Sequence, residues 1–122
     1  MKLLTHNMLA STARGVANGF PLGIEATALE THSAEFNKEF LKHVFPKLEW
    51  GALVDACKSL ALPELPQVVT DEHWDDDAFL KQLHHNLLEV HIQEGNLVCP
   101  ETGRKFPVTK GVPNMLLNED EV

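Results

Sequence analysis

Residues 90–109, VHIQEGNLVCPETGRKFPVT, carry the clearest β-strand pattern in this chain. In the first half of this stretch apolar residues alternate with polar ones, which is the period of a β-strand with one buried face. The apolar positions are Val90, Ile92, Leu97 and Cys99. We interpret Glu94-Gly95, in the middle of the alternation, as the turn of a β-hairpin, because glycine adopts the positive φ that a tight turn requires.

The second half of the stretch predicts another turn and another strand. Residues 101–103 form the turn, and within residues 105–109 the side chains of Phe106 and Val108 share one face. Two hairpins are too few to bury both faces of a sheet. We therefore expect the N-terminal third to complete the sheet, with a strand in residues 20–24.

The middle of the chain has the period of α-helices. Apolar residues recur at spacings of three and four in three segments, and each set lies on one helical face. The sets are Phe36, Phe40, Leu41 and Val44; Trp50, Leu53, Val54, Cys57 and Leu60; and Phe79, Leu80, Leu83, Leu87 and Leu88. Asn37 or Ser33 can cap the first helix. Pro63 and Pro66 break the chain into a linker after the second.

The change of period divides the chain where its charge also changes. Residues 35–90 hold five basic and eleven acidic residues, a net charge of −6, whereas residues 1–34 are neutral and residues 91–122 carry −2. We therefore predict an α+β fold in which residues 1–34 and 89–122 form one discontinuous antiparallel β domain. Residues 35–88 form a helical insert, and its acidity leaves the β domain nearly neutral and able to pack on a protein.

Length and composition exclude several classes of protein. The chain has 122 residues, a net charge of −8 and two cysteines. No apolar run is long enough to span a bilayer, and residues 1–7 lack the apolar core of a signal peptide. Two cysteines cannot build the disulfide framework of a small secreted domain, so we expect a reducing compartment. The acidic balance argues against a chain that grips a phosphate backbone by itself.

Histidines and aspartates raise the question of a metal site, but their spacing favours structural roles. His84 and His85 are adjacent on a predicted helix, so their side chains diverge by about 100° and do not converge easily on one ion. The other histidines are scattered at His6, His32, His43, His73 and His91. The carboxylates of Asp75-Asp76-Asp77 also diverge, whereas a Mg²⁺ site needs converging oxygens. Such an acidic run is typical of a helix start, where it meets the positive end of the helix dipole.

Cys99-Pro100-Glu101-Thr102-Gly103 is similar to the tight turn on which a zinc ribbon places two thiolates. Thr102, a poor zinc ligand, occupies the position of the second thiolate, and Cys57 is predicted to lie on a helix of the insert. We therefore expect no bound zinc. A nucleophilic Cys99 would need a neighbouring histidine and an oxyanion hole, and the sequence indicates neither.

Motifs for nucleotide cofactors and for nucleic acid are missing or weak. The glycine-rich patterns GxGxxG and GxxxxGK[ST] do not occur. Arg104, Lys105 and Lys110 form a small basic cluster beside an acidic tail, which makes a weak RNA surface. Apolar residues do gather at both ends of the chain, and such ends pack either on the domain or on a partner. They are Leu3, Leu4, Met8, Leu9, Val112, Met115, Leu116 and Leu117.

A set of short motifs runs along the whole chain. The motifs are MKLLTHNML at residues 1–9, EFN at 35–37, EW at 49–50, HHNLLEV at 84–90, EG at 94–95, CPETGRKFP at 99–107 and GVPNMLL at 111–117. In this order they resemble the eukaryotic multifunctional methyltransferase activator subunits. The resemblance implies a zinc-ribbon-like antiparallel β domain formed by both termini, with an inserted helical domain, which agrees with the division predicted from charge and period.

The resemblance also implies a function. Members are non-catalytic activating and stabilising subunits of several class I S-adenosylmethionine-dependent methyltransferases that act on tRNA, 18S rRNA and a translation termination factor. They form heterodimers in which the enzyme binds S-adenosylmethionine. The β domain covers an apolar patch of the enzyme and extends its central sheet by strand pairing, so main-chain hydrogen bonds supply affinity. The implied locations are cytoplasm and nucleus, with no membrane and no direct contact to nucleic acid.

The sequence departs from the family at the zinc site. Zinc-binding members carry two cysteines near the N-terminus and a CxxC near the C-terminus. The resemblance aligns these positions with Ser11, Val16, Cys99 and Thr102. One ligand of four remains, so we do not carry zinc over and expect no cofactor. The stability of this region is then expected to rest on apolar packing around Phe20, Phe106 and Cys99.

The contact regions of the family map onto both ends of this chain. The predicted partner-binding residues are Leu4, Thr5, His6, Asn7, Met8, Leu9, Val112, Pro113, Asn114, Met115 and Leu116. An alternative function is a small RNA-binding module of the translation apparatus, against which the charge and the missing zinc ligands both count. A methyltransferase or a Cys/His hydrolase acting alone has no support, because the chain is too short for a full class I fold beside its insert and shows no catalytic constellation.

Overall fold

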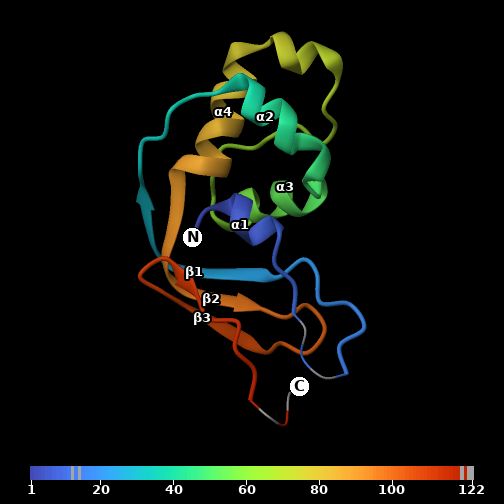
Figure 1. Cartoon of the computed structure of the whole chain (residues 1–122), viewed down its shortest axis with the longest axis vertical. Helices are drawn as coiled ribbons and strands as arrows, with labels where there is room; N and C mark the ends of the chain where they lie inside the picture. Colours follow the sequence, from blue (N-terminus) through green and yellow to red (C-terminus); the bar gives the residue numbers. More distant parts are fainter. Residues whose placement is uncertain (12, 14, 119, 121–122) are drawn as a thin grey trace.

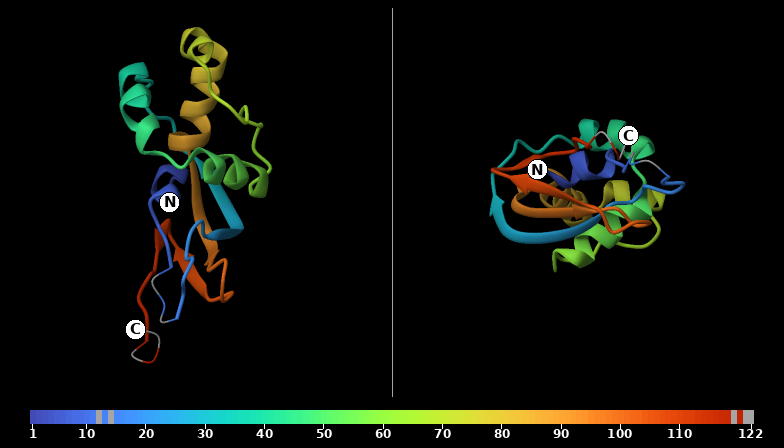
Figure 2. Two further views of the ribbon diagram at one scale, coloured as in Figure 1. Left: turned by 90° about the vertical axis from the view of Figure 1, so that its right-hand side faces the viewer. Right: turned by 90° about the horizontal axis from the view of Figure 1, so that it is seen from below.

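The computed structural model describes residues 1–11, 13, 15–118 and 120. Helices α2, α3 and α4 form one end of an elongated molecule and an antiparallel sheet forms the other, with α1 between them (Figure 1, Figure 2). Within the described residues the sheet has four strands in the order β1-β2-β3-β4. The predicted α+β class is therefore confirmed.

The sheet joins segments that lie far apart in the sequence. β1 (Gly23–Thr31) pairs antiparallel with β2 (Val90–Val98), from Gly23 opposite Val98 to Thr31 opposite Val90. The chain therefore leaves the sheet after Thr31 and returns to it at Val90, at the same end of the sheet. β3 (Lys105–Thr109) pairs with the other edge of β2, and the short β4 (Val112–Pro113) pairs with β3.

The predicted turn at Glu94-Gly95 is wrong. β2 runs through both residues and pairs with β1, with Gly95 opposite Ala26 and Glu94 opposite Ala28, and the register shifts between these two pairs. Gly95 has a φ of +151°, and a Cβ there would collide with the backbone of Glu25 and Ala26. Gly95 allows the two strands to approach closely at a bulge. Besides forming turns, this is a common role of glycine in a sheet.

The remaining strand predictions hold in part. The strand predicted at residues 105–109 is confirmed as β3, and Phe106 and Val108 are buried on one face. The N-terminal strand begins at Gly23, so Ile24 belongs to it and residues 20–22 precede it. Phe20 is only half-buried, whereas Phe106 and Cys99 lie in the core. β4 was not predicted, because a two-residue strand carries no periodic signal.

The first two predicted helices are confirmed. α2 (Lys38–Val44) begins after Asn37, whose side-chain oxygen accepts the N–H of Phe40 at 3.1 Å, so Asn37 and not Ser33 is the cap. A short 3₁₀ turn, η1 (Phe45–Lys47), follows it. α3 (Trp50–Ser59) comes next and ends before the proline-containing linker.

The acidic run starts a helix, as predicted. It first forms a 3₁₀ turn, η2 (Asp71–Asp75), and then leads into α4 (Asp77–His84). The carboxylate of Asp76 accepts the N–H groups of Ala78 and Phe79, at 3.0 and 3.3 Å, and so caps α4. A π-helical turn, η3 (His85–Glu89), then delivers the chain into β2.

An N-terminal helix that the sequence analysis did not predict joins the two ends of the molecule. α1 (Leu3–Asn7) contacts α3 and η3. Buried apolar residues of the helices, such as Leu53, and of the sheet, such as Leu97 and Phe106, belong to one cluster that includes Leu3. The boundaries predicted at residues 34/35 and 88/89 remain a prediction. In the described part of the chain no helix combines the length and apolarity needed to span a membrane.

Candidate partner-binding surface

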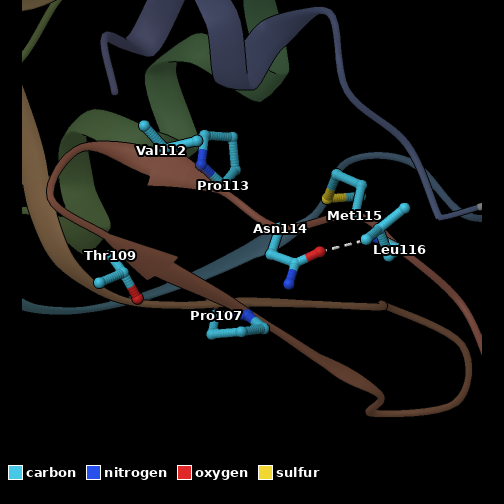
Figure 3. Close-up of a pocket in the computed structure, with 7 residues that line it drawn as sticks. All are labelled: Pro107, Thr109, Val112, Pro113, Asn114, Met115 and Leu116. Atoms are coloured by element: carbon cyan, nitrogen blue, oxygen red, sulfur yellow. Dashed lines mark hydrogen bonds between the residues drawn. The ribbon is translucent and has the colours of Figure 1, made fainter.

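The C-terminal part of the sheet borders an open hollow of about 670 Å³ (Figure 3). Its lining residues are Pro107, Thr109, Val112, Pro113, Asn114, Met115 and Leu116. The last five are all of the C-terminal residues that the sequence predicted for partner binding. Pro107 and Thr109 were missed, although the alternation that buries Phe106 and Val108 leaves both on the exposed face of β3.

Hydrogen bonds hold this segment in place. The N–H of Asn114 donates to the carbonyl of Pro107 at 2.8 Å, and the side-chain oxygen of Asn114 accepts the N–H of Leu116 at 3.0 Å (Figure 3). Met115 is half-buried and packs against the core, whereas Val112 is 66% and Leu116 80% exposed. Apolar side chains that are fixed and yet exposed in a group are typical of an interaction surface.

The N-terminal predicted residues divide into exposed and buried ones. Met8 is 53% exposed, Thr5 is exposed, and Leu4 and Leu9 are half-buried. His6 and Asn7 are buried instead.

His6 and Asn7 anchor α1 inside the molecule. His6 Nε2 donates to the carbonyl of Leu22 at 2.7 Å. The amide of Asn7 donates to the carbonyl of Glu49 at 3.0 Å and accepts the N–H of Glu49 at 2.9 Å. Because these side chains already bind the loop before β1 and the start of α3, we replace their predicted role in partner binding by this anchoring role.

The two ends of the chain meet along one strand. The N–H₃⁺ of Met1 donates to the carbonyl of Ile92, and the N–H of Ile92 donates back to Met1, at 2.7 and 2.8 Å. The N–H of Gly111 donates to the next carbonyl of β2, that of Gln93, at 3.0 Å. The N-terminal segment therefore lies beside the β3–β4 turn, as both orientations show (Figure 1, Figure 2).

We call the accessible members of these two segments the terminal surface. They are Leu4, Thr5, Met8, Leu9, Val112, Pro113, Asn114, Met115 and Leu116.

The turn around Cys99 keeps the hydrogen bonds of a knuckle, since the N–H of Gly103 donates to the carbonyl of Cys99 at 3.0 Å. Burial raises the pKa of the Cys99 thiol, but hydrogen bonds from the side chains of Ser11 and Thr102 and from the backbone of Thr102 and Glu101 outweigh burial and lower this pKa to about 7. Two hydroxyls and one thiol are a poor donor set for zinc. The fourth aligned residue, Val16, has no donor and packs against the core, so these residues do not fit a zinc site.

The carboxylate of Glu101 joins two loops that lie far apart in the sequence. Glu101 Oε2 accepts the N–H groups of Ala17 and Asn18 at 2.6 and 3.1 Å, which ties the turn after Cys99 to the N-terminal loop. Within that loop the N–H of Ser11 donates to the carbonyl of Gly19 at 2.8 Å. No local sequence pattern predicts this link, because the residues are more than eighty positions apart.

The histidines take structural roles in the described residues. His84 and His85 approach different oxygens of Glu89, at 3.7 and 3.0 Å, and the rings of His32 and His91 stack with centroids 4.5 Å apart. No group of three or more His, Cys, Asp or Glu side chains is arranged to hold a metal in residues 1–11, 13, 15–118 and 120.

Comparison with known families identifies the group to which the chain belongs. The family model described as Trm112p-like protein matches residues 2–111. The chain belongs to the Trm112p-like family. This membership confirms the resemblance on which the terminal surface was predicted.

Curated relatives of this Trm112p-like chain match it from end to end. Multifunctional methyltransferase subunit TRM112 homolog A of Arabidopsis thaliana is 55% identical over 124 residues and covers 100% of both chains. The TRM112-like protein of Mus musculus is 52% identical and covers 99% of this chain and 98% of the relative. The TRM112 subunit of Saccharomyces cerevisiae is 31% identical, with 96% of each chain covered.

A solved structure has the same fold. It is the E. cuniculi Mtq2–Trm112 complex, responsible for methylation of the eRF1 translation termination factor. The match covers 100% of this chain and 98% of the chain in that structure, with a TM-score of 0.58 and 18% identity. At that identity the likeness concerns the fold.

Proposed function

We propose that this chain is a non-catalytic subunit that binds, stabilises and activates several class I S-adenosylmethionine-dependent methyltransferases. Their substrates would be tRNA, 18S rRNA and a translation termination factor. The names of the relatives and the complex of the structural neighbour support this proposal. The observation that carries it is the terminal surface, where exposed apolar residues of the C-terminal segment line a hollow and the N-terminal segment is bound to the same part of the sheet.

The terminal surface can recognise an enzyme in two ways. Burying an exposed apolar side chain such as Met8, Val112 or Leu116 contributes roughly 1.5–3 kcal/mol each. β4 pairs with β3 on one side only among the described strands, so its other edge is available to a strand of the enzyme. Main-chain pairing depends little on side-chain identity, which lets one subunit serve several enzymes.

Activation follows from binding alone. A subunit that binds the folded enzyme and not the unfolded one stabilises it by mass action, by about 2.7 kcal/mol at a hundredfold excess over Kd. Ordering the enzyme's cofactor-binding loops would lower the entropic cost of binding S-adenosylmethionine. The enzyme binds that cofactor, and Val112, Pro113 and Leu116 supply only apolar contacts.

Three further points belong to this proposal. We expect the subunit to work without zinc, which the poor donor set around Cys99 supports. We expect it to bind no nucleic acid directly, in line with its net charge of −8. We also expect it in the cytoplasm and the nucleus, where its enzymes would meet their substrates.

The test is a double substitution on the terminal surface. Met8→Asp with Leu116→Asp places two charges where the enzyme would bury apolar groups, and we expect affinity for each methyltransferase to fall at least about a hundredfold. Affinity capture followed by mass spectrometry measures the loss across all partners, and methyl transfer by the reconstituted heterodimer measures activation. We prefer Leu116 to Met115, because Met115 packs against the core and its replacement would also change stability.

The matched control is Val68→Asp. Val68 is 70% exposed and apolar like the two test residues, but it lies in the linker of the helical part. This variant should capture every enzyme normally. If the double variant captures its enzymes as well as the control does, the terminal surface is not the binding site. If the unsubstituted chain captures no methyltransferase, the proposed function itself is wrong.

A further inference from the structure

A second hollow lies in the helical part, away from the terminal surface. Its volume is about 390 Å³, and it opens between the α2–η1 segment on one side and η2 on the other. Lys42, Phe45, Pro46, Asp71, Trp74 and Asp75 line it. A hollow of this size stands at the small end of ligand sites, which span roughly 300–1,000 Å³.

Two aromatic rings form a fixed part of its wall. Phe45 and Trp74 meet edge to face, with centroids 5.3 Å apart and planes at 81°. Behind them, Phe45 contacts Trp50 and Trp74 contacts Phe79 in the same geometry, at 5.5 and 6.3 Å. Both lining rings are half-buried, so packing fixes them while part of each ring faces the hollow.

Two carboxylates in the lining suit the helix starts that the acidic run forms, but they have no side-chain partner among the described residues. Asp76, in the same acidic run, caps α4, but Asp71 and Asp75 form no ion pair or side-chain hydrogen bond with any residue that the structure describes. Lys42 is the one cationic residue of the lining, and it also forms no ion pair within the described residues. The hollow therefore combines aromatic faces with an excess of negative charge.

We propose that this hollow binds an arginine side chain presented by a segment of another protein. A cation over an aromatic ring gains attraction from the negative ring face, and a carboxylate beside the ring adds a charged hydrogen-bond acceptor. Residues 35–90 carry a net charge of −6, which complements a basic segment and attracts it at long range.

Arginine fits this lining better than lysine. The guanidinium is planar, stacks on aromatic faces and can donate to two carboxylates at once, whereas the ammonium of lysine is compact and strongly hydrated. The ammonium of Lys42 opposes the incoming charge, so binding requires this exposed side chain to turn toward solvent.

The experiment is a titration of the full chain, labelled with ¹⁵N, with three short peptides. The peptides are acetyl-Gly-Arg-Gly-amide, its lysine counterpart and its citrulline counterpart, which has the shape of arginine without the charge. The two tryptophans give separate indole N–H signals. We expect the arginine peptide to shift the Trp74 signal and to leave that of Trp50 unchanged, because the Trp50 indole donates to the carbonyl of Pro66 at 2.8 Å.

Substitutions of lining residues refine the test. Asp71→Asn with Asp75→Asn should weaken binding of the arginine peptide at least about fivefold, and Trp74→Leu about threefold or more. Lys42→Gln should strengthen it by up to about twofold. Glu64→Gln removes one exposed carboxylate outside the hollow and should leave the affinity within about twofold.

Several outcomes would overturn the proposal. Equal shifts with the arginine and citrulline peptides would show that charge is not recognised. Tighter binding of the lysine peptide would exclude arginine as the preferred ligand, and unchanged affinity after the double aspartate substitution would exclude the hollow. Because the titration needs no methyltransferase, its result is independent of the function proposed for the terminal surface.

Discussion

At Gly95 the absence of a side chain sets the distance between two strands. The backbone of β1 passes so close that a Cβ would overlap Glu25, and the φ of +151° is itself unfavourable for other residues. Gly51 offers a contrast within the same chain. It lies in α3, and a Cβ there would meet nothing within 4 Å.

These two glycines give the first prediction. Gly95→Ala should lower the free energy of unfolding by about 3 kcal/mol or more, because β1 and β2 must separate to admit the methyl group. Gly51→Ala should raise it by up to about 1 kcal/mol, since alanine favours a helix over glycine. Urea unfolding of both variants checks the prediction. Similar effects of the two substitutions would mean that the strands are not closely packed at this point.

The second prediction concerns the carboxylate of Glu101. Glu101→Ala removes the acceptor of the N–H groups of Ala17 and Asn18 and should cost about 1 kcal/mol of stability, because the bonds are solvent-exposed. Hydrogen exchange of these two amides should quicken at the same time. Glu72→Ala, an exposed glutamate of η2, is the control and should leave both amides unchanged. Slow exchange that persists in the Glu101 variant would contradict the link between the loops.

Among the elements, α4 shows how a single cap holds a helix start. Asp76→Ala leaves two N–H groups without their acceptor and should destabilise the protein by about 1 kcal/mol. Asp76→Asn keeps a cap of similar strength and should cost only a few tenths of a kcal/mol. Urea midpoints measured side by side distinguish the two. An equal loss in both variants would show that the charge of Asp76 matters more than its hydrogen bonds.

The helices were the elements that the sequence predicted best. Their apolar residues repeat over about nine to eleven positions, so α2, α3 and α4 follow from a periodic pattern with caps and prolines at the ends. α1 and β4 are too short to carry such a pattern, and only their neighbours stabilise them. The turn predicted at Gly95 is wrong because a glycine in a turn and a glycine at a close strand contact look identical in sequence.

The partner-binding site stays a prediction, and the sequence anticipated the exposure of its residues only in part. Apolar side chains near both ends indicated a surface, and Val112 and Leu116 are indeed exposed. His6 and Asn7 lie between exposed neighbours in the sequence, yet one turn of helix rotates them inward. The link through Glu101 depends on loops that only the fold brings together, so no local sequence pattern predicts it.

At the scale of the whole molecule, two histidines make stability depend on pH. Burial lowers the pKa of His6 below its ordinary 6.5, and the hydrogen bond to Leu22 offsets this only in part. Burial, together with repulsion from the stacked His32, also lowers the pKa of His91. Near and below pH 6.5 these histidines therefore bind more protons in the unfolded chain than in the folded chain.

The fourth prediction follows from the sign of this difference. The contribution of these two histidines to stability is fully present above pH 6.5 and should fall as the pH drops from there through the folded pKa values of His6 and His91. A further loss should follow below pH 4.5, because hydrogen bonds from Ala34 and His85 lower the pKa of Glu89. Urea midpoints at pH 7.5, 5.5 and 4 measure both steps.

A substitution separates the contributions to this pH dependence. His91→Gln removes one titrating ring and should flatten the step between pH 7.5 and 5.5, while the loss below pH 4.5 stays. A midpoint that is constant or rises on acidification would contradict the assignment of neutral His6 and His91 to the folded state.

Because Thr31 pairs with Val90, the parts of this chain can fold only in a certain order during its synthesis on the ribosome. β1 is synthesised early, but its partner β2 follows only after the whole insert. The edges of β1 therefore stay unpaired while the helices form their local contacts. Residues 111–116 emerge later still. We therefore expect a nascent chain interrupted before residue 111 to form its helices but not to bind a methyltransferase. The complex should form only after translation has passed that residue.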